Sequence, residues 1–350
     1  MLSSKKDSPD NKWRDETSFS TQLDYIKYIQ GQPFSVQLLM AEANLPVAQR
    51  LVASYYFDKK DFKAHLFWIK KSADNSDPMS LIMLADYHVA KNELDEAMTC
   101  ADKAMVAAKN LTDKNYLEHI NSVLTDTLFN IGLKSTQANA VDRAKKAWEK
   151  AVTFNCTASA LNLIQLNIEA NNFKEALFYT DLALYFSKDY SKPEQQKEYR
   201  SECHMLRGII KFEVLGEKVP YSDLLDVVSE FQKSIAYKKN ERNTANLEQV
   251  LNGVSAENKS SLMEASQTLA FENGTYKTVT EVLHSAGKNK EEVAQWIEYQ
   301  DPRVASTPEP TTTSEVRLSL LLKDLGTFSL RDNPGPQTQD NDDQEKCSIM

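Results

Sequence analysis

The sequence predicts an all-α protein built from consecutive pairs of helices. Apolar and small residues recur at helical spacing over 48–57 and over 62–73, with the polar turn 58–61 between them, as in two amphipathic helices. The pattern returns over 81–104, where 91–93 takes the place of the turn. Only 9 of the 350 residues are glycine, which argues against Rossmann and sandwich folds. A helix pair that returns after about 34 residues indicates a helical-repeat array.

Particular residues of these two pairs resemble known repeats. The first pair resembles a Sel1-like repeat through Tyr55, Tyr56, Phe57, Asp61, Phe62, Lys63, Ala64, Trp68 and Ala73. The second pair resembles a tetratricopeptide repeat (TPR) through Leu84, Ala85, Ala97, Ala101 and Ala104. The resemblance implies a right-handed superhelical solenoid of TPR/Sel1-like helix pairs, in which the first helix of each pair lines a concave face that binds a protein or peptide.

Later copies are recognised by the alanine that opens each second helix. Ala64, Ala97, Ala144 and Ala176 occupy this place, at intervals of 33, 47 and 32 residues. The long middle interval predicts an insertion, which we expect as a loop over 134–139. Trp68 and Trp148 stand at equivalent repeat positions and are therefore expected in the core.

Composition divides the chain into three parts. Residues 1–18 are polar and predicted to be disordered, and residues 19–300 are predicted to form the solenoid. Residues 301–350 form a proline- and threonine-rich flexible, disordered tail that contains a short amphipathic helix over 314–325. Its leucine stripe, 318–325, could dock on the C-terminal third of the array, recognise another protein or lie on a membrane, and the scarcity of basic residues favours the membrane least.

Charge and residue spacing exclude several functions. The net charge is −9 without a basic stripe, so we expect no nucleic-acid binding. The four cysteines show no paired spacing, and the five histidines are dispersed, which predicts no disulfide framework and no metal site. Cys203 and His204 are adjacent on one helix and point apart, so we expect packing roles for them. Without a phosphate loop or nucleophile elbow, we expect neither catalytic residues nor a cofactor.

The last four residues, Cys347, Ser348, Ile349 and Met350, resemble a CaaX prenylation signal. This resemblance implies that a prenyl transferase attaches a farnesyl group to Cys347, that Ser348, Ile349 and Met350 are removed, and that the new carboxylate is methylated. A single lipid chain is a weak anchor, and the acidic approach to Cys347 adds no attraction to anionic lipids. We therefore expect a cytoplasmic protein that is partly membrane-associated at the cytosolic face.

The predicted concave face supplies the candidate partner-binding residues. By repeat position they are Gln49, Tyr56, Ile82, Asp86, Leu161 and Gln165. Ordinary surface or packing roles are the alternative for each of them.

These features together favour a farnesylated helical-repeat adaptor that holds a protein partner at a membrane. One alternative is a soluble scaffold or co-chaperone in which the CaaX match is accidental. Another is a bacterial effector prenylated by its host, since Sel1-like repeats are common in bacteria and bacteria lack the prenyl transferase. A third, an enzyme with an unrecognised site, would need a polar cluster that the sequence alone does not reveal.

Overall fold

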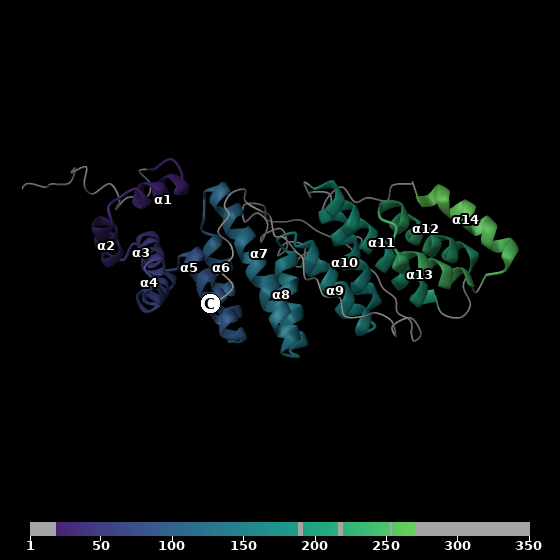
Figure 1. The fold of residues 1–350 in the computed structure, drawn as a ribbon, viewed down its shortest axis with the longest axis horizontal. Coiled ribbons are helices and arrows are strands. Elements are labelled where there is room, and N and C mark those ends of the chain that lie inside the picture. The colour runs from purple at the N-terminus through teal and green to yellow at the C-terminus, as the bar shows by residue number, and fades with distance from the viewer. Residues whose placement is uncertain (1–18, 188–191, 216–219, 253, 271–350) are drawn as a thin grey trace, which may run out of the picture. The chain divides into compact units, whose positions relative to one another are not determined.

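The computed structural model describes residues 19–187, 192–215, 220–252 and 254–270, and within these ranges it contains helices and no strand (Figure 1). The helices are α1 (Gln22–Gln30), α2 (Phe34–Glu42), α3 (Pro46–Asp58), α4 (Phe62–Asp74), α5 (Pro78–Ala90), α6 (Leu94–Ala108), α7 (Lys114–Gln137), α8 (Val141–Val152), α9 (Thr157–Glu169), α10 (Phe173–Phe186), α11 (Pro193–Leu215), α12 (Tyr221–Tyr237), α13 (Glu241–Asn252) and α14 (Ala256–Ala270). The all-α class is confirmed. The predictions for residues 1–18 and for the tail, including the 314–325 helix and Cys347, lie outside the described residues.

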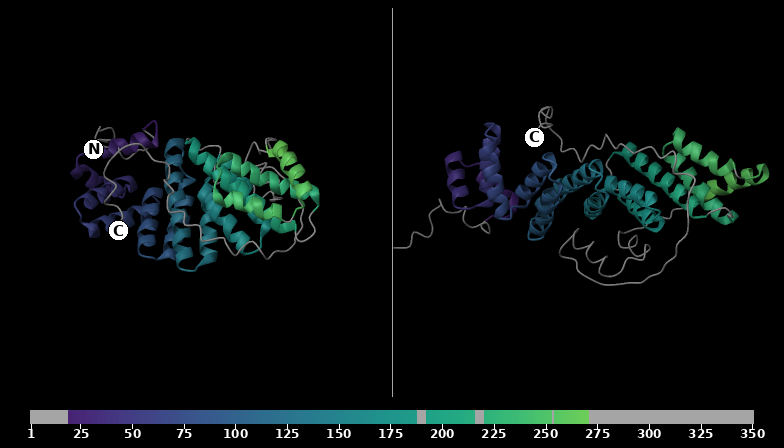
Figure 2. Two further views of the ribbon diagram at one scale, coloured as in Figure 1. Left: turned by 45° about the vertical axis from the view of Figure 1, so that its right-hand side comes forward. Right: turned by 90° about the horizontal axis from the view of Figure 1, so that it is seen from below.

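The described residues group into two compact units, one that ends at Ala147 and one that begins at Trp148. In the first unit, α3 packs on α4, α5 on α6, and α5 also on α7. Figure 2 shows this pairing in the purple and blue helices from two further directions. In the second unit, α9 packs on α10 and α11 on α12, while α9 contacts α11 and α11 contacts α13. Each unit is thus a row of helix pairs in which first helices meet first helices.

In the described part of the chain, seven helices end in the same type of turn. Each turn contains one residue with φ between 60° and 64°, and these residues are Asn44, Lys60, Ser76, Asn92, Asn139, Asn155 and Asn171. In the turn at Lys60, the Lys60 N–H donates to the Phe57 carbonyl, and the Asp61 N–H donates to the Tyr56 carbonyl. All seven turns repeat these two bonds, which define the Schellman motif. The residue after each left-handed residue is the N-cap of the following helix. One helix with its turn therefore takes 16 residues, both from Asn44 to Asn92 and from Asn139 to Asn171.

The extra length of the middle repeat lies in a helix. The loop expected over 134–139 is wrong, because α7 continues to Gln137 and only two residues then precede Ala140. Ser135 is fully buried, whereas the residues on either side of it, Lys134, Thr136 and Gln137, are exposed, so this end of the helix lies at the surface with one side chain packed inward. The insertion therefore lengthens α7 to 24 residues.

Small residues let paired helices approach closely. Ala97, Ala144 and Ala176 are completely buried, and Ala64 is half-buried. The two predicted core tryptophans, Trp68 and Trp148, are 8% and 3% exposed, which confirms that both belong to the packing. Among the described residues, no helix has the length and apolar character needed to cross a membrane.

Candidate functional site

The first helices of the N-terminal unit, α3, α5 and α7, form what we call the first-helix face. One guanidinium ties its three helices together. Arg50 of α3 donates from Nε to Asp77 Oδ2 at 2.9 Å and from Nη2 to the Tyr116 hydroxyl of α7 at 3.3 Å. Asp77 also caps α5, since its Oδ2 accepts from the Ser80 N–H at 2.8 Å. The face is therefore held by buried, charge-assisted bonds.

Asp86 is the predicted partner-binding residue with the most suitable surroundings. It lies on α5, and its Oδ1 accepts a 2.8 Å hydrogen bond from the Thr127 hydroxyl of α7. Thr127 is buried, whereas Asp86 is reached by solvent. Desolvation nevertheless raises the pKa of Asp86 to about 6, and the charge of Asp126 adds to the rise against the lowering effect of the Thr127 bond.

Asp86 and Asp126 lack a counter-charge. Neither forms an ion pair with any residue in the described ranges, and desolvation also raises the pKa of Asp126. Elsewhere in the same unit carboxylates are matched, as in Asp77 with Arg50 and Asp95 with Arg143. The first-helix face therefore presents unneutralised negative charge that a cationic group from outside would stabilise.

The other predicted groove residues divide by burial. Tyr56 is half-buried with its ring edge against Phe34 and Tyr55, and Gln165 is half-buried and donates to Glu169 at 2.8 Å. These two side chains remain partly available to a partner.

Three groove assignments are corrected by burial. Gln49 and Ile82 are 0% exposed and Leu161 is 5% exposed, so none can offer its side chain to a partner. Gln49 instead donates to the Ala41 carbonyl at 3.0 Å and accepts from the Asn75 amide at 2.9 Å. The repeat pattern placed these three residues on first helices, α3, α5 and α9, but their side chains point into the protein interior.

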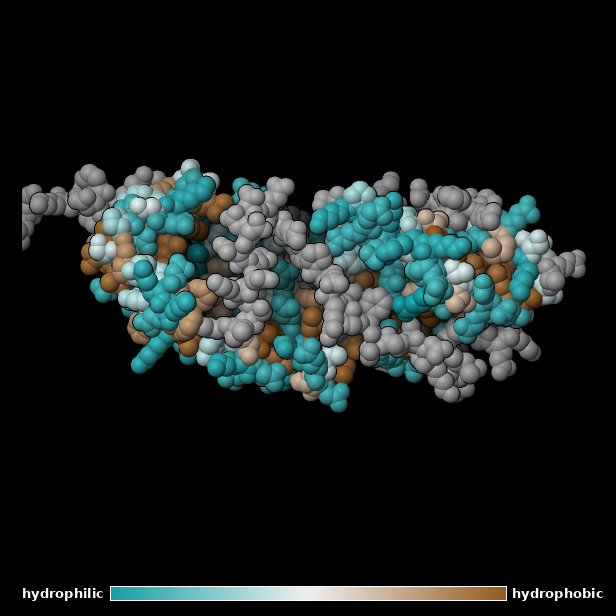
Figure 3. Space-filling view, viewed as in Figure 1, coloured by the Kyte–Doolittle hydropathy of each residue, from teal (hydrophilic) through white to brown (hydrophobic). Residues whose placement is uncertain are grey.

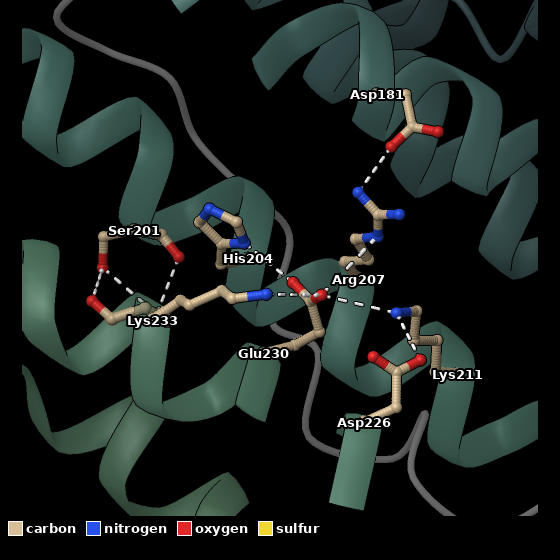
Figure 4. A network of polar contacts seen from close by, with 9 residues as sticks. Asp181, Ser201, His204, Arg207, Lys211, Asp226, Glu230 and Lys233 are labelled. Carbon is tan, nitrogen blue, oxygen red and sulfur yellow. Dashed lines mark hydrogen bonds and ion pairs between the residues drawn. The ribbon is translucent and has the colours of Figure 1, made fainter. Parts of the chain in front are cut away.

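Sequence reasoning missed a charge cluster in the C-terminal unit. Glu230 of α12 is 4% exposed in its side chain and is surrounded by cationic groups from two helices (Figure 4). Its Oε2 pairs with His204 Nδ1 at 2.7 Å, and its Oε1 lies 3.4 Å from the amines of Lys211 and Lys233 and 3.9 Å from Arg207 Nε. Because a carboxylate only accepts, Nδ1 carries the shared proton.

The cluster is nearly neutral as a whole. Arg207 also donates to Asp181 at 2.6 Å, and Lys211 to Asp226 at 2.6 Å, as Figure 4 shows. Burial would raise the pKa of Glu230, but the His204 hydrogen bond and the charges of Arg207 and Lys211 hold the pKa well below its usual range. The spacing of His204, Arg207 and Lys211 along one face of α11 was the available sequence signal.

This charge cluster is built for packing rather than for nucleophilic chemistry. The neighbouring Cys203 thiol is fully buried, and burial raises its pKa, which keeps it protonated and unreactive. The imidazole of His204 stacks on the ring of Tyr237, with the two planes 5° apart and the centroids separated by 5.6 Å. Across the described part of the chain, no group of His, Cys, Asp and Glu is arranged to hold a metal ion.

Comparisons with known proteins add little to this geometry. No protein-family model matches the chain, and no curated protein matches it. Among solved structures, a protective antigen present in uropathogenic Escherichia coli strains and displaying an SLR fold is similar over 81% of this chain and 76% of that chain, with 12% sequence identity and a TM-score of 0.20. At that TM-score the likeness supports no inference, and the helix-pair fold rests on the packing and turns described above.

Proposed function

We propose that this protein is a helical-repeat adaptor whose first-helix face binds a cationic segment of a partner protein. The unneutralised pair Asp86 and Asp126 carries the proposal. A lysine or arginine of the partner placed between α5 and α7 would donate charge-assisted hydrogen bonds to both carboxylates and neutralise their charge. The Arg50 bonds hold the helices in place before the partner arrives.

We further propose that the protein is farnesylated at Cys347 and acts at the cytosolic face of a membrane. The support is the CaaX pattern of its last four residues. One lipid chain gives reversible attachment, which suits an adaptor that carries its partner to and from a membrane.

A peptide-binding measurement tests the first-helix face. Peptides are selected from a displayed random library on the full-length protein, and their affinities are measured for the wild type and for Asp86→Asn combined with Asp126→Asn. We expect the selected peptides to contain Arg or Lys and the double variant to bind at least about tenfold more weakly. Wild-type affinity should also fall as the pH is lowered through about 6, because protonation of Asp86 removes the charge that the peptide recognises.

The control is Asp142→Asn, which removes one exposed carboxylate from α8 and should leave binding unchanged. Selection of acidic or uncharged peptides, or equal binding by the double variant, would show that the two carboxylates are not the recognition site.

Metabolic labelling with a farnesyl analogue tests the lipid. The wild type should be labelled and partly sediment with membranes, and Cys347→Ser should be unlabelled and soluble. An unlabelled wild type would favour the soluble scaffold. Labelling in eukaryotic cells of a chain with a bacterial source would favour the host-prenylated effector.

A further inference from the structure

The α3–α4 pair carries exposed aromatic side chains on its surface. Tyr55 and Phe57 of α3 are 37% and 41% exposed, and Phe62 and Phe67 of α4 are 41% and 58% exposed. The rings of Phe57 and Phe62 meet across the turn at Lys60, with centroids 5.9 Å apart. Large aromatics left in water this way are costly and mark interaction surfaces when they gather in one place.

Lysines lie among these rings. Lys59, Lys60, Lys63 and Lys70 are exposed, and none forms an ion pair with a described residue. The Lys59 amine lies 5.5 Å from the ring centre of Tyr55, and the Lys71 amine lies 5.1 Å from that of Trp68. Figure 3 shows hydrophobic and hydrophilic residues intermixed over α2–α4 at the left of the view.

The local charge opposes that of the whole chain. Residues 54–74 contain five lysines and three aspartates, in a protein of net charge −9. One of these aspartates, Asp61, already caps α4, because its Oδ1 accepts from the Ala64 N–H at 3.0 Å. The surface is therefore a local positive region with free ammonium groups.

On α4 the two residue types share the outward side. Lys63, Phe67 and Lys70 are exposed at i, i+4 and i+7, so they line one stripe of the helix. Trp68 and Ile69 are buried, as are Ser72 and Ala73, and they bind the helix to its neighbours. The stripe is thus free for contact without disturbing the fold.

We propose that this aromatic–lysine surface docks on an anionic lipid bilayer. Aromatic rings favour the membrane–water interface, and lysines within a Debye length of an anionic bilayer are attracted to its phosphates and carboxylates. The lysine stems lie along apolar surface while their amines reach the headgroups. At one lipid interface the aromatic rings leave water and the ammonium groups pair with anionic headgroups.

The charge pattern favours lipid over a protein partner. A protein interface concentrates its aromatics in a core from which lysine is depleted, whereas here lysines and aromatics alternate. This inference rests on the proposed membrane function. A single farnesyl chain needs a second signal for stable attachment, and the aromatic–lysine surface would supply it. It requires no lipid on Cys347, so it can be tested separately.

Vesicle sedimentation of full-length, unprenylated Cys347→Ser protein tests the proposal. We expect binding to vesicles with about 30% phosphatidylserine that exceeds binding to phosphatidylcholine vesicles at least about a hundredfold and is lost in about 1 M salt. The triple change Lys59→Ala, Lys63→Ala and Lys70→Ala should lower the partition coefficient by about a hundredfold, at about fivefold per lysine. Phe67→Ser should lower it as well, because a ring is removed from the interface.

The matched control is Lys134→Ala, Lys146→Ala and Lys174→Ala, which removes the same charge from exposed lysines elsewhere. It should change the partition coefficient less than about twofold, and thermal unfolding should confirm that both triple variants are folded. Equal binding to both vesicle types, no binding to either, or equal losses in the two triple variants would overturn the proposal. Unchanged vesicle binding by the Lys59→Ala, Lys63→Ala and Lys70→Ala variant would show that this surface does not contact lipid. An unlabelled Cys347 would refute farnesylation and leave these vesicle results intact.

Discussion

The ring of Phe231 packs against Gly208 with no room for a side chain between them. A Cβ added at Gly208 would lie 3.0 Å from Cζ of Phe231 and 3.1 Å from both Cε atoms. Phe231 is itself 1% exposed, so the ring cannot withdraw into solvent. The close approach of α11 and α12 therefore depends on the missing side chain at Gly208.

Gly208→Ala should destabilise the protein. Overpacking against the fixed ring costs about 1–3 kcal/mol, and the better helix propensity of alanine returns about 1 kcal/mol, so we expect a net loss of about 1 kcal/mol in the free energy of unfolding, measured with urea. Phe231→Leu alone should also destabilise, but in that background Gly208→Ala should become neutral or stabilising. An equal cost of Gly208→Ala in both backgrounds would show that the ring is not the obstacle.

Glu230→Gln should be much more damaging than Asp226→Asn. The first change leaves Lys211, Lys233 and His204 beside a neutral group in a buried site, which costs about 3–5 kcal/mol. The second removes only the solvent-exposed partner of Lys211, worth about 0–1 kcal/mol. Denaturant unfolding at neutral pH compares the two variants directly, and similar losses would contradict the central role of Glu230.

The contribution of Glu230 to the free energy of unfolding should also depend on pH. The folded-state pKa of Glu230 lies below the ordinary value of 4.5, so its contribution is complete above pH 4.5 and is lost as the pH falls through the folded-state pKa. The wild type should therefore lose more stability than Glu230→Gln when the pH is lowered below 4.5. A constant difference between them across this range would mean that Glu230 does not titrate as described.

Asp86→Asn should stabilise the protein at neutral pH. The folded-state pKa of about 6 lies above the ordinary 3.8, so the folded protein binds the proton more tightly, and this group lowers stability as the pH rises from 3.8 to 6. After allowance for solvent screening of the exposed side chain, we expect a gain of at most about 1 kcal/mol at pH above 6 and a smaller gain near pH 4. Thr127→Val should act in the opposite direction, because it removes the hydroxyl that supports the ionised carboxylate. A larger gain from Asp86→Asn at pH 4 than at neutral pH would contradict the raised pKa.

Lys60→Gly and Lys59→Gly should change stability in opposite directions. Lys60 has φ of 60°, where a side chain costs about 1–2 kcal/mol relative to glycine, and the greater freedom of glycine in the unfolded chain cancels part of the gain. We expect a net gain of about 0.5 kcal/mol. The adjacent Lys59 has φ of −81°, so glycine there should cost about 0.5–1 kcal/mol. Denaturant midpoints measure both, and a loss at Lys60 as large as that at Lys59 would argue against the Schellman turn.

Helix pairing was predictable because it depends on the spacing of small and apolar residues within one short stretch of sequence. The alanines at 97, 144 and 176 and the two tryptophans stand at repeat positions, and their burial follows from the period. The rotation of each helix about its axis was less predictable. Gln49, Ile82 and Leu161 lie on the expected helices and face the packing, while Asp86 faces outward.

Contacts between distant segments were hidden for a different reason. The cations around Glu230 come from α11 as well as α12, and only the packing of the two helices brings them together. The sequence predicted a loop at the end of α7 because its last four residues, 134–137, are all polar, although Ser135 is buried. Lys60 and Ser76 adopt left-handed backbone angles, which could not be predicted from their residue types because Lys and Ser rarely have positive φ.

The 16-residue recurrence of the turns also bears on how such a chain can grow. Duplication of one helix with its turn would exchange the roles of all later helices, so that residues selected for the first-helix face would be forced into the second row. Duplication of two consecutive helices with their turns leaves every later helix in its original row. The left-handed residues Lys60 and Asn92, two helices apart, are therefore natural crossover points, at which recombination could add or delete a whole pair while every remaining helix keeps its neighbours.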